Sequence, residues 1–295
     1  MTRSSCKMAA PRDLISALSS LDFDLDYSSW NVRLNLIAGG FLFYAGIFAF
    51  GHLASIVLFA TYRSLPTKEK VFWNLAATRA VFGVQCIVAG LNALLIDPVL
   101  AADQITGQQG WAAFTMLIAI GFFTFENLAL HTSNFVFWTF DIFLAVHHFF
   151  AFLGYFGAVI CSTVGHYMPM VTLLLEMSTP FTCISWMLLK AGWSQTLFWK
   201  VNQWVMIHMF HCRMVLTYHM WWVSLSNWDH LLSSVNVLYV AFFFVGLSLV
   251  TLILNPYWTY KKTQQLLTPV DWNFESISKP SSRARNGRNF IKKNE

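Results

Sequence analysis

The near absence of charged residues over long stretches constrains this chain more than any other feature. Between Asp103 and Lys190 lie 86 residues, of which only Glu126, Asp141 and Glu176 are charged. Over all 295 residues, 56% are hydrophobic and 11% are charged, whereas soluble domains carry about 25% charged residues. A water-soluble globule is therefore excluded, and we predict an all-α, polytopic membrane protein.

Seven apolar segments are long enough to cross a bilayer as helices. The predicted spans cover residues 34–62, 71–96, 111–131, 137–160, 167–189, 200–225 and 232–255. The polar segment 1–33 lacks the apolar core of a cleavable signal peptide, so the first span is expected to act as a retained signal anchor. We accordingly divide the chain into a lumenal tail (1–33), a first transmembrane helix (34–62), a transmembrane domain (63–262) and a cytosolic tail (263–295).

The distribution of Lys and Arg predicts the orientation. With the N-terminus on the lumenal side, thirteen of the 19 Lys and Arg residues lie in cytosolic segments, as the positive-inside rule requires. Eight of them lie between Lys261 and Glu295, next to the membrane or in a polar tail. Nucleic-acid binding needs basic residues on a folded polar face. We therefore expect anionic membrane lipids, and not nucleic acid, to meet this charge.

The chain ends in the sequence KKNE, with Lys292 and Lys293 at the fourth and third positions from its last residue. Two lysines at these positions of a cytosolic tail form a dilysine retrieval signal. Vesicle coat proteins read this signal and return membrane proteins to the endoplasmic reticulum, so it is an address and not an anchor. We predict residence in the endoplasmic reticulum membrane, with coat proteins as partners.

Ionisable side chains inside the predicted spans are the candidates for function. Each one costs at least about 2.5–3.5 kcal/mol at the bilayer centre, so it needs a partner or a role. We predict that they converge on one polar cavity inside the bundle. The candidate catalytic residues are His147, His148, Asp141 and Glu176, and the other polar residues of the cavity are Arg79, Glu126, His208, His211 and Arg213.

Helix geometry refines this prediction. Asp141 and His148 are seven residues apart and lie on one stripe of the fourth span. On the sixth span, His208 and His211 share a face, whereas Arg213 points elsewhere and is expected to meet a carboxylate of another span. Pro180 cannot donate a hydrogen bond to the carbonyl of residue 176, so we expect a kink near Glu176. Simple interhelical hydrogen bonding is the alternative, and we favour it for His52, His131 and His219.

An imidazole beside a carboxylate can accept an acyl group from a thioester and pass it to a hydroxyl group. The sequence therefore indicates an acyltransferase with acyl-CoA as co-substrate and with no bound cofactor or metal. The coenzyme A phosphates are expected to meet cytosolic lysines, for which the candidates are Lys190, Lys200, Lys261 and Lys262. The five cysteines form no C-x-x-C pair, so no zinc site is predicted.

Two motifs resemble a known family. The run DIFLAVHH (141–148) is similar to the adjacent-histidine signature of the TLC membrane family, which includes the ceramide synthases. The run LEMSTPF (175–181) resembles the Glu-x-Ser-Thr-Pro element of the family's branch outside the ceramide synthases. A closer resemblance within the family rests on the segments 72–85, 173–183, 210–222 and 255–267 and covers about residues 23–275. It implies a six-helix TLC bundle, formed by spans two to seven, that follows one additional N-terminal helix.

The resemblance also implies a function. In ceramide synthases the paired histidines, here His147 and His148, carry acyl transfer from acyl-CoA. Those enzymes have two aspartates on the next helix where this chain has Glu176, so a glycerophospholipid-type acceptor is expected in place of a sphingoid base. The resemblance further implies residence in the endoplasmic reticulum and its intermediate compartment with the Golgi. The alternative function that it implies is a cargo receptor for lysosomal enzymes, active in lysosome biogenesis without catalysis.

Two other functional classes fit less well. A rhodopsin-like receptor has Asn-Pro-x-x-Tyr in its seventh span, but this chain has Thr259 where that motif requires Tyr. A di-iron lipid oxidase needs several clustered histidine boxes, and the pairs His147–His148 and His208–His211 are too few.

Overall fold

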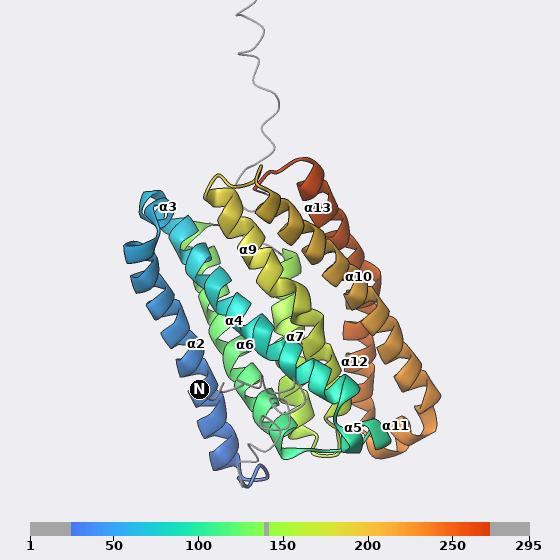
Figure 1. Cartoon of the computed structure of the whole chain (residues 1–295). Helices are drawn as coiled ribbons and strands as arrows, with labels where there is room; N and C mark the ends of the chain where they lie inside the picture. Colours follow the sequence, from blue (N-terminus) through green and yellow to red (C-terminus); the bar gives the residue numbers. More distant parts are fainter. Residues whose placement is uncertain (1–24, 139–141, 272–295) are drawn as a thin grey trace, which may run out of the picture.

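The computed structural model describes residues 25–138 and 142–271, and every regular element in these ranges is helical. Seven long rods lie side by side in one bundle (Figure 1). They are α2 (Trp30–Leu58), α4 (Thr67–Leu95), α6 (Gly110–Phe137), α7 (Ile142–Ile160), α8 with η1 and α9 (Tyr167–Leu174, Leu175–Ser178, Thr179–Lys190), α10 (Leu197–Ser226), and α12 with η2 and α13 (Val237–Leu249, Val250–Leu254, Asn255–Leu267). The short helices α3 (Ala60–Ser64), α5 (Pro98–Ala102) and α11 (Trp228–Ser234) lie at the ends of the rods. The predicted all-α membrane fold is confirmed.

Six of the rods in the described part of the chain are long and apolar enough to cross a membrane. The seventh rod, α10, has 30 residues but is more polar, because it carries a lysine, an arginine and three histidines. Its inward face packs against α9 and α13. The bundle therefore has the seven long rods that the sequence predicts, six of which qualify as membrane spans by length and composition.

Several helix ends differ from the predicted ones. The first span stops at Leu58 and restarts as α3, whereas helix α6 runs to Phe137, through the gap expected between the spans 111–131 and 137–160. The last span was expected to end at residue 255, but α13 continues to Leu267. Pro256 does not stop it, because this proline occupies the first turn of α13, where no amide hydrogen is needed, and it follows the π-helical turn η2.

The two ends of the bundle differ in charge. The end with α3 and the C-terminal ends of α9 and α13, at the top of Figure 1, is named the basic end here. It gathers seven lysines and arginines of the loops and helix ends, whereas Arg33 lies in the first turn of α2 at the opposite end. The seven are Arg63, Lys68, Lys70, Lys190, Lys200, Lys261 and Lys262. The opposite end carries Asp97, Asp103 and Asp229. The compartment that each end faces stays a prediction.

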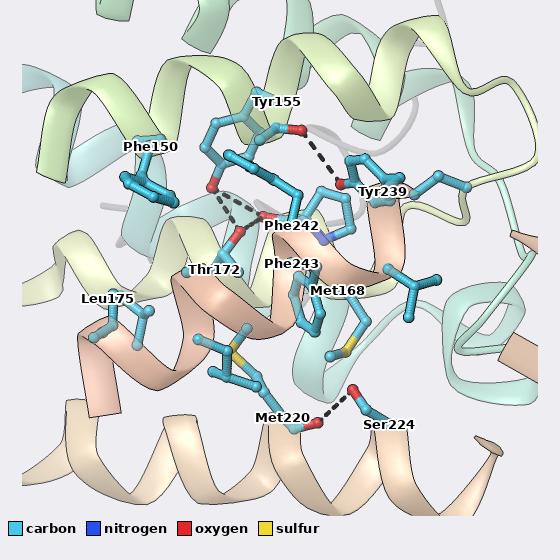
Figure 2. Close-up of a pocket in the computed structure, with 18 of the residues that line it drawn as sticks. Phe150, Tyr155, Met168, Thr172, Leu175, Met220, Ser224, Tyr239, Phe242 and Phe243 are labelled. Atoms are coloured by element: carbon cyan, nitrogen blue, oxygen red, sulfur yellow. Dashed lines mark hydrogen bonds between the residues drawn. The ribbon is translucent and has the colours of Figure 1, made fainter. Parts of the chain in front are cut away.

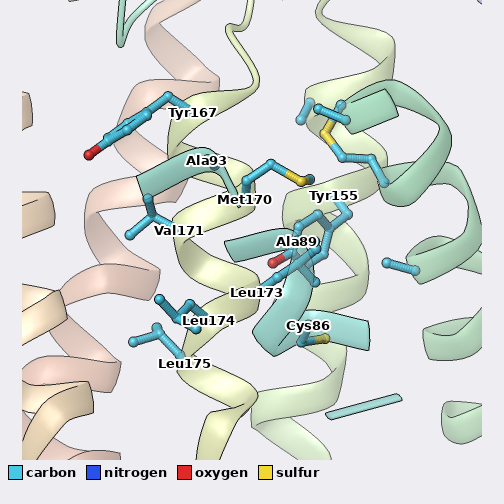
Figure 3. Packing of buried hydrophobic residues seen from close by; sticks show 14 of the residues in the cluster. Cys86, Ala89, Ala93, Tyr155, Tyr167, Met170, Val171, Leu173, Leu174 and Leu175 are labelled. Atoms are coloured by element: carbon cyan, nitrogen blue, oxygen red, sulfur yellow. The ribbon is translucent and has the colours of Figure 1, made fainter. Parts of the chain in front are cut away.

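Small residues allow the rods to pack closely. Cys86, Ala89 and Ala93 of α4 face Leu173 and Leu174 of the fifth rod within the buried core (Figure 3). Small side chains at a helix interface bring the two backbones together, which favours association in a membrane. This contact holds α4 against the rod that carries Glu176.

Candidate functional site

The centre of the site is a hydrogen bond between α7 and η1. His147 Nε2 lies 2.9 Å from Glu176 Oε1, and Thr179 Oγ1 donates to Glu176 Oε2 at 2.5 Å. An ionised carboxylate only accepts hydrogen bonds, so Nε2 is the donor in this bond and, in the neutral imidazole, the lone pair is on Nδ1. His147 and Glu176 therefore form the couple that the sequence predicts.

The sequence around Pro180 explains how Glu176 reaches this position. Pro180 has no amide hydrogen, and the chain tightens into the 3₁₀ turn η1 just before it, as the expected kink requires. The amide of Thr179 takes up the carbonyl of Glu176. A Cβ atom at Gly83 of α4 would lie 2.6 Å from Pro180 Cδ, so only glycine lets α4 approach the kink this closely.

A second polar group lies beside the first. The rings of His147 and His148 are 5.2 Å apart, and His148 Nε2 lies 3.8 Å from Glu126 Oε1. Glu126 is fully buried and accepts two hydrogen bonds from Arg79, of which the bond from Nε is 2.8 Å long. The charge of Arg79 is therefore neutralised within the bundle.

Arg213 of α10 is also buried, with 3% of its surface exposed. Its Nη1 donates to Ser178 Oγ at 2.8 Å, and its guanidinium lies 5.4 Å from the ring centre of Trp258. No carboxylate within the described ranges makes an ion pair with it. Glu176 of the fifth rod nevertheless lies close enough to interact electrostatically with Arg213. The carboxylate of another span that the sequence predicts is therefore present, without a direct ion pair.

A polar cavity of about 580 Å³ joins these groups to the basic end. His147, His148 and Glu176 line its deep part. Five cationic side chains also line it, namely Lys68, Arg79, Arg213, Lys261 and Lys262. The predicted polar cavity therefore exists, and cations outnumber carboxylates in its wall.

A second cavity of about 160 Å³ lies between α7, α8, α10 and α12. Its wall is apolar and aromatic, with Phe150, Met168, Phe242 and Phe243 among the lining side chains (Figure 2). Along the last rod the lining runs from Tyr239 to Leu254, which corresponds to about 20 Å of helix. This elongated apolar space can hold a hydrocarbon chain.

The two cavities share two lining residues, His147 and Glu176. The hydrogen-bonded couple therefore stands where the polar cavity and the apolar cavity meet. Trp258 of α13 supports it, because its ring lies edge-on to His147 with 5.3 Å between the ring centres. A molecule with a charged head and an apolar chain could occupy both cavities and place the group between them at His147.

Several predicted site residues lie elsewhere. His208 and His211 are exposed on the outer face of α10, so the prediction that they line the cavity is wrong. The inward face of α10 includes Asn202, Phe210 and Arg213. A charged arginine facing lipid costs more free energy than an imidazole there, which favours the orientation that turns Arg213 inward. Three other predicted residues, Asp141, Lys292 and Lys293, lie outside the described residues.

Of the four candidate lysines, two line the polar cavity and two do not. Lys261 and Lys262 line the polar cavity, whereas Lys200 is exposed outside it. Lys190 is held by two carboxylates, with Nζ 3.0 Å from Glu69 Oε1 and 2.6 Å from Asp271 Oδ2. Lys190 is therefore not placed to bind a phosphate in this cavity.

Sequence reasoning missed Trp258, Thr179 and Lys68 as members of the site. Thr179 stands three residues after Glu176, a spacing that could have indicated a local hydrogen bond. Trp258 carried no signal of its own, because aromatic residues in membrane spans are by default lipid-facing or interfacial. Within the described ranges, no three His, Cys, Asp or Glu side chains come together to hold a metal ion.

Comparison with known proteins agrees with this architecture. The TLC domain model matches residues 73–263. Protein CLN8 of Homo sapiens is 62% identical over 271 residues, covering 92% of this chain and 95% of its own, and Protein CLN8 of Canis lupus familiaris is 65% identical over 261 residues, covering 88% and 91%. The human TLC domain-containing protein 2 is 29% identical over 48% of this chain and 54% of its own.

No solved structure matches the chain. The family model nevertheless covers α4 to α13 almost completely, and with them the wall of the polar cavity except Lys68 and Phe72. This finding confirms the family that the two sequence motifs indicated. The chain belongs to the TLC-domain family, whose domain is preceded here by the additional helix α2.

Proposed function

We propose that this protein is an acyl-CoA-dependent acyltransferase of the endoplasmic reticulum membrane that moves a fatty acyl group to a hydroxyl group of a glycerophospholipid-type acceptor. One observation carries the proposal: the His147–Glu176 couple stands at the junction of a polar, cation-lined cavity and an apolar cavity. An acyl thioester has the same division, with a phosphate-bearing head on one side of its reactive carbonyl and a hydrocarbon chain on the other.

The couple supplies the chemistry of transfer. With Nε2 held by Glu176, the Nδ1 lone pair of His147 attacks the thioester carbonyl carbon, a carbon–nitrogen bond forms, and the carbon–sulfur bond breaks. The coenzyme A thiolate leaves and takes up a proton. The acceptor hydroxyl then attacks the acyl-imidazole, loses its proton to the bulk or to the second imidazole, and releases His147. Glu176 orients the ring and stabilises its positive charge in both steps.

The lysines of the polar cavity support a coenzyme A donor. Lys68, Lys261 and Lys262 line the cavity toward the basic end, which the positive-inside rule assigns to the cytosol. Acyl-CoA is made and held in the cytosol, so its phosphates would enter at this end. The acyl chain would extend past His147 into the apolar cavity.

The test is a lipidomic comparison of cells that carry the wild type, His147→Ala or His211→Ala. His211 is a matched control, because it is a histidine inside a long helix but outside both cavities. We expect His147→Ala to deplete one class of glycerophospholipid at normal protein abundance and His211→Ala to leave it unchanged. Identical lipidomes in the three lines would contradict the proposal.

A second function is favoured by the chain's last residues. Lys292 and Lys293 stand where coat proteins read a dilysine signal, as expected of a receptor that carries newly made lysosomal enzymes from the endoplasmic reticulum toward the Golgi and then returns. Changing both lysines to Ala is expected to mislocalise the protein and to lower lysosomal enzyme levels, while membrane extracts keep any acyl transfer. Loss of lysosomal enzymes in the His147→Ala line alone would instead tie that effect to catalysis.

A further inference from the structure

The guanidinium of Arg213 is the least satisfied charge in the described part of the molecule. Nη1 donates to Ser178 Oγ, but the buried Nε and Nη2 donors meet no acceptor among the described residues. The side chain lines the polar cavity and is 3% exposed. A buried charged donor without an acceptor is strongly unfavourable, so the arrangement points to an acceptor that belongs to a ligand.

Arg79 shows how the same cavity treats an arginine that has a partner in the chain. Its Nε and Nη2 both donate to Glu126 Oε1, so these two donors are satisfied within the chain. Arg213 has no such carboxylate, since both oxygens of nearby Glu176 are already engaged, one by His147 and one by Thr179. The donors of Arg213 are thus left for a molecule that enters the cavity.

The shape of the site selects the chemistry of that molecule. Nε and an Nη nitrogen of one guanidinium form a planar fork that matches two oxygens of a phosphate or carboxylate group. The aromatic rings of Phe210 and Trp258 lie 5.0 Å and 5.4 Å from the guanidinium carbon and hold its plane in place. Such a fixed, desolvated fork binds an oxyanion and discriminates against a neutral group of the same size.

We infer that Arg213 is the binding residue for a phosphate-type oxyanion of the substrate, held beside the His147–Glu176 couple. The inference rests on the proposed function, because Arg213 would position a substrate of that reaction. Ser178, which Arg213 contacts, lies two residues from Glu176, so the oxyanion would bind close to the reacting atoms. Two sources supply this chemistry, the phosphodiester of an acceptor lipid and the phosphates of coenzyme A.

Binding to the full-length protein in lipid nanodiscs tests the inference without any acyl transfer. Two pairs of probes are compared. Lysophosphatidic acid and monoacylglycerol of the same chain differ only in the phosphate, and coenzyme A differs from pantetheine by its phosphate-bearing nucleotide. We expect the wild type to prefer the phosphate-bearing member of at least one pair. Arg213→Gln should lower the affinity for that member about tenfold or more and leave the affinity for the phosphate-free member unchanged, as expected when a charge-assisted pair of hydrogen bonds is lost.

Lys200→Gln is the matched control, because it removes one positive charge from the same helix outside the cavity. It should leave all four affinities unchanged. Loss confined to lysophosphatidic acid assigns the oxyanion to the acceptor, and loss confined to coenzyme A assigns it to the donor. Arg213→Lys serves if the Gln variant does not fold, since it keeps the charge but not the fork and should lose most of the preference.

A measurement on the unmodified protein locates the site. An arginine-directed dicarbonyl reagent, read by mass spectrometry, should label Arg213, and only the preferred phosphate-bearing probe should protect it. A wild type with no phosphate preference in either pair overturns the inference, as does a preference that survives Arg213→Gln or Arg213→Lys. Because none of these readouts needs turnover, a protein that binds the oxyanion but transfers no acyl group would overturn the proposed function alone.

Discussion

The two cavities that meet at His147 and Glu176 are built by different means. The polar cavity takes its walls from α4, α6, α7, η1, α9, α10 and α13 and holds two buried arginines, one of them paired with Glu126. The apolar cavity lies toward the opposite end, between α7, α8, α10 and α12, and its wall includes rings and methyl groups (Figure 2). Its few polar side chains mostly bond within the wall, as Tyr155 does with Thr172 at 2.7 Å.

The two cavities therefore differ in how sensitive they are to substitution. In the polar cavity a charge removed from one partner leaves another charge buried, so a single substitution has large consequences. In the apolar cavity the contacts are small and numerous, so a substitution changes volume and not charge. Changes on the polar side should therefore affect folding and rate, and changes on the apolar side should affect the choice of chain.

The largest effect is expected at the junction itself. Glu176→Gln keeps the size of the side chain and its bond from Thr179, but it removes the negative charge that orients and stabilises the His147 ring. We expect acyl transfer to fall about a thousandfold, the range in which general acid–base groups contribute. Steady-state transfer by purified protein checks this, with thermal unfolding as the control for folding. Wild-type turnover in this variant would show that the couple is not catalytic.

The next effect is on stability in the wall of the polar cavity. Glu126→Ala leaves the guanidinium of Arg79, 8% exposed, without its partner. Breaking a buried ion pair from one side costs about 3–5 kcal/mol, so we expect a marked loss of unfolding free energy, measured by thermal or denaturant unfolding. The double variant Arg79→Met with Glu126→Leu should recover most of it. A single variant as stable as the wild type would mean that water reaches Arg79.

The sequence predicted the polar cavity because ionisable residues inside spans need partners, and it predicted the η1 kink because Pro180 lacks an amide hydrogen. It did not reveal which face of α10 points inward. Helical periodicity places His208 and His211 on one face and Arg213 on another, but the choice between the faces depends on the neighbouring helices. Packing against α9 and α13 turned Arg213 inward.

The same limit applies to pairing between helices. Arg79 and Glu126 are 47 residues apart, and nothing in their spacing joins them, since such a contact is set by how α4 and α6 approach each other. Local signals such as the Pro180 kink were readable from a few residues. The junction of the two cavities was not readable in this way, because it needs six rods in place at once.

A pH effect is expected where the apolar cavity ends. His166 follows Val164 and Gly165, which line that end, and its Nδ1 accepts the Gln109 amide at 3.0 Å. Burial lowers the pKa of His166 from 6.5 to about 4. The unfolded chain therefore binds the proton first as pH falls, and stability should drop between pH 6.5 and pH 4, by about 2 kcal/mol from pH 7 to pH 5.

Unfolding free energies of the wild type and His166→Asn, measured over this pH range, isolate the contribution. Asn can accept the same amide hydrogen without titrating. The unfolding free energy of the wild type relative to that of His166→Asn should therefore be about 2 kcal/mol lower at pH 5 than at pH 7. Parallel stability curves for the two proteins would show that His166 is protonated in the folded state as readily as in the unfolded one.

The smallest effect is expected inside the apolar cavity. Gly246 of α12 lines it, and a Cβ atom there would lie 3.6 Å from Phe150 Cδ1, an ordinary contact distance. Gly246→Leu should therefore fold and shorten the space for a chain. Since a few methylene groups change binding by about 1–3 kcal/mol, kcat/KM for long acyl chains should fall about tenfold relative to short ones. Gly46→Leu on α2, where a Cβ atom meets nothing within 4 Å, is the control that should leave chain preference unchanged. An equal fall for every chain length in Gly246→Leu would mean that the acyl chain lies elsewhere, because only a group that occupies this cavity can sense its length.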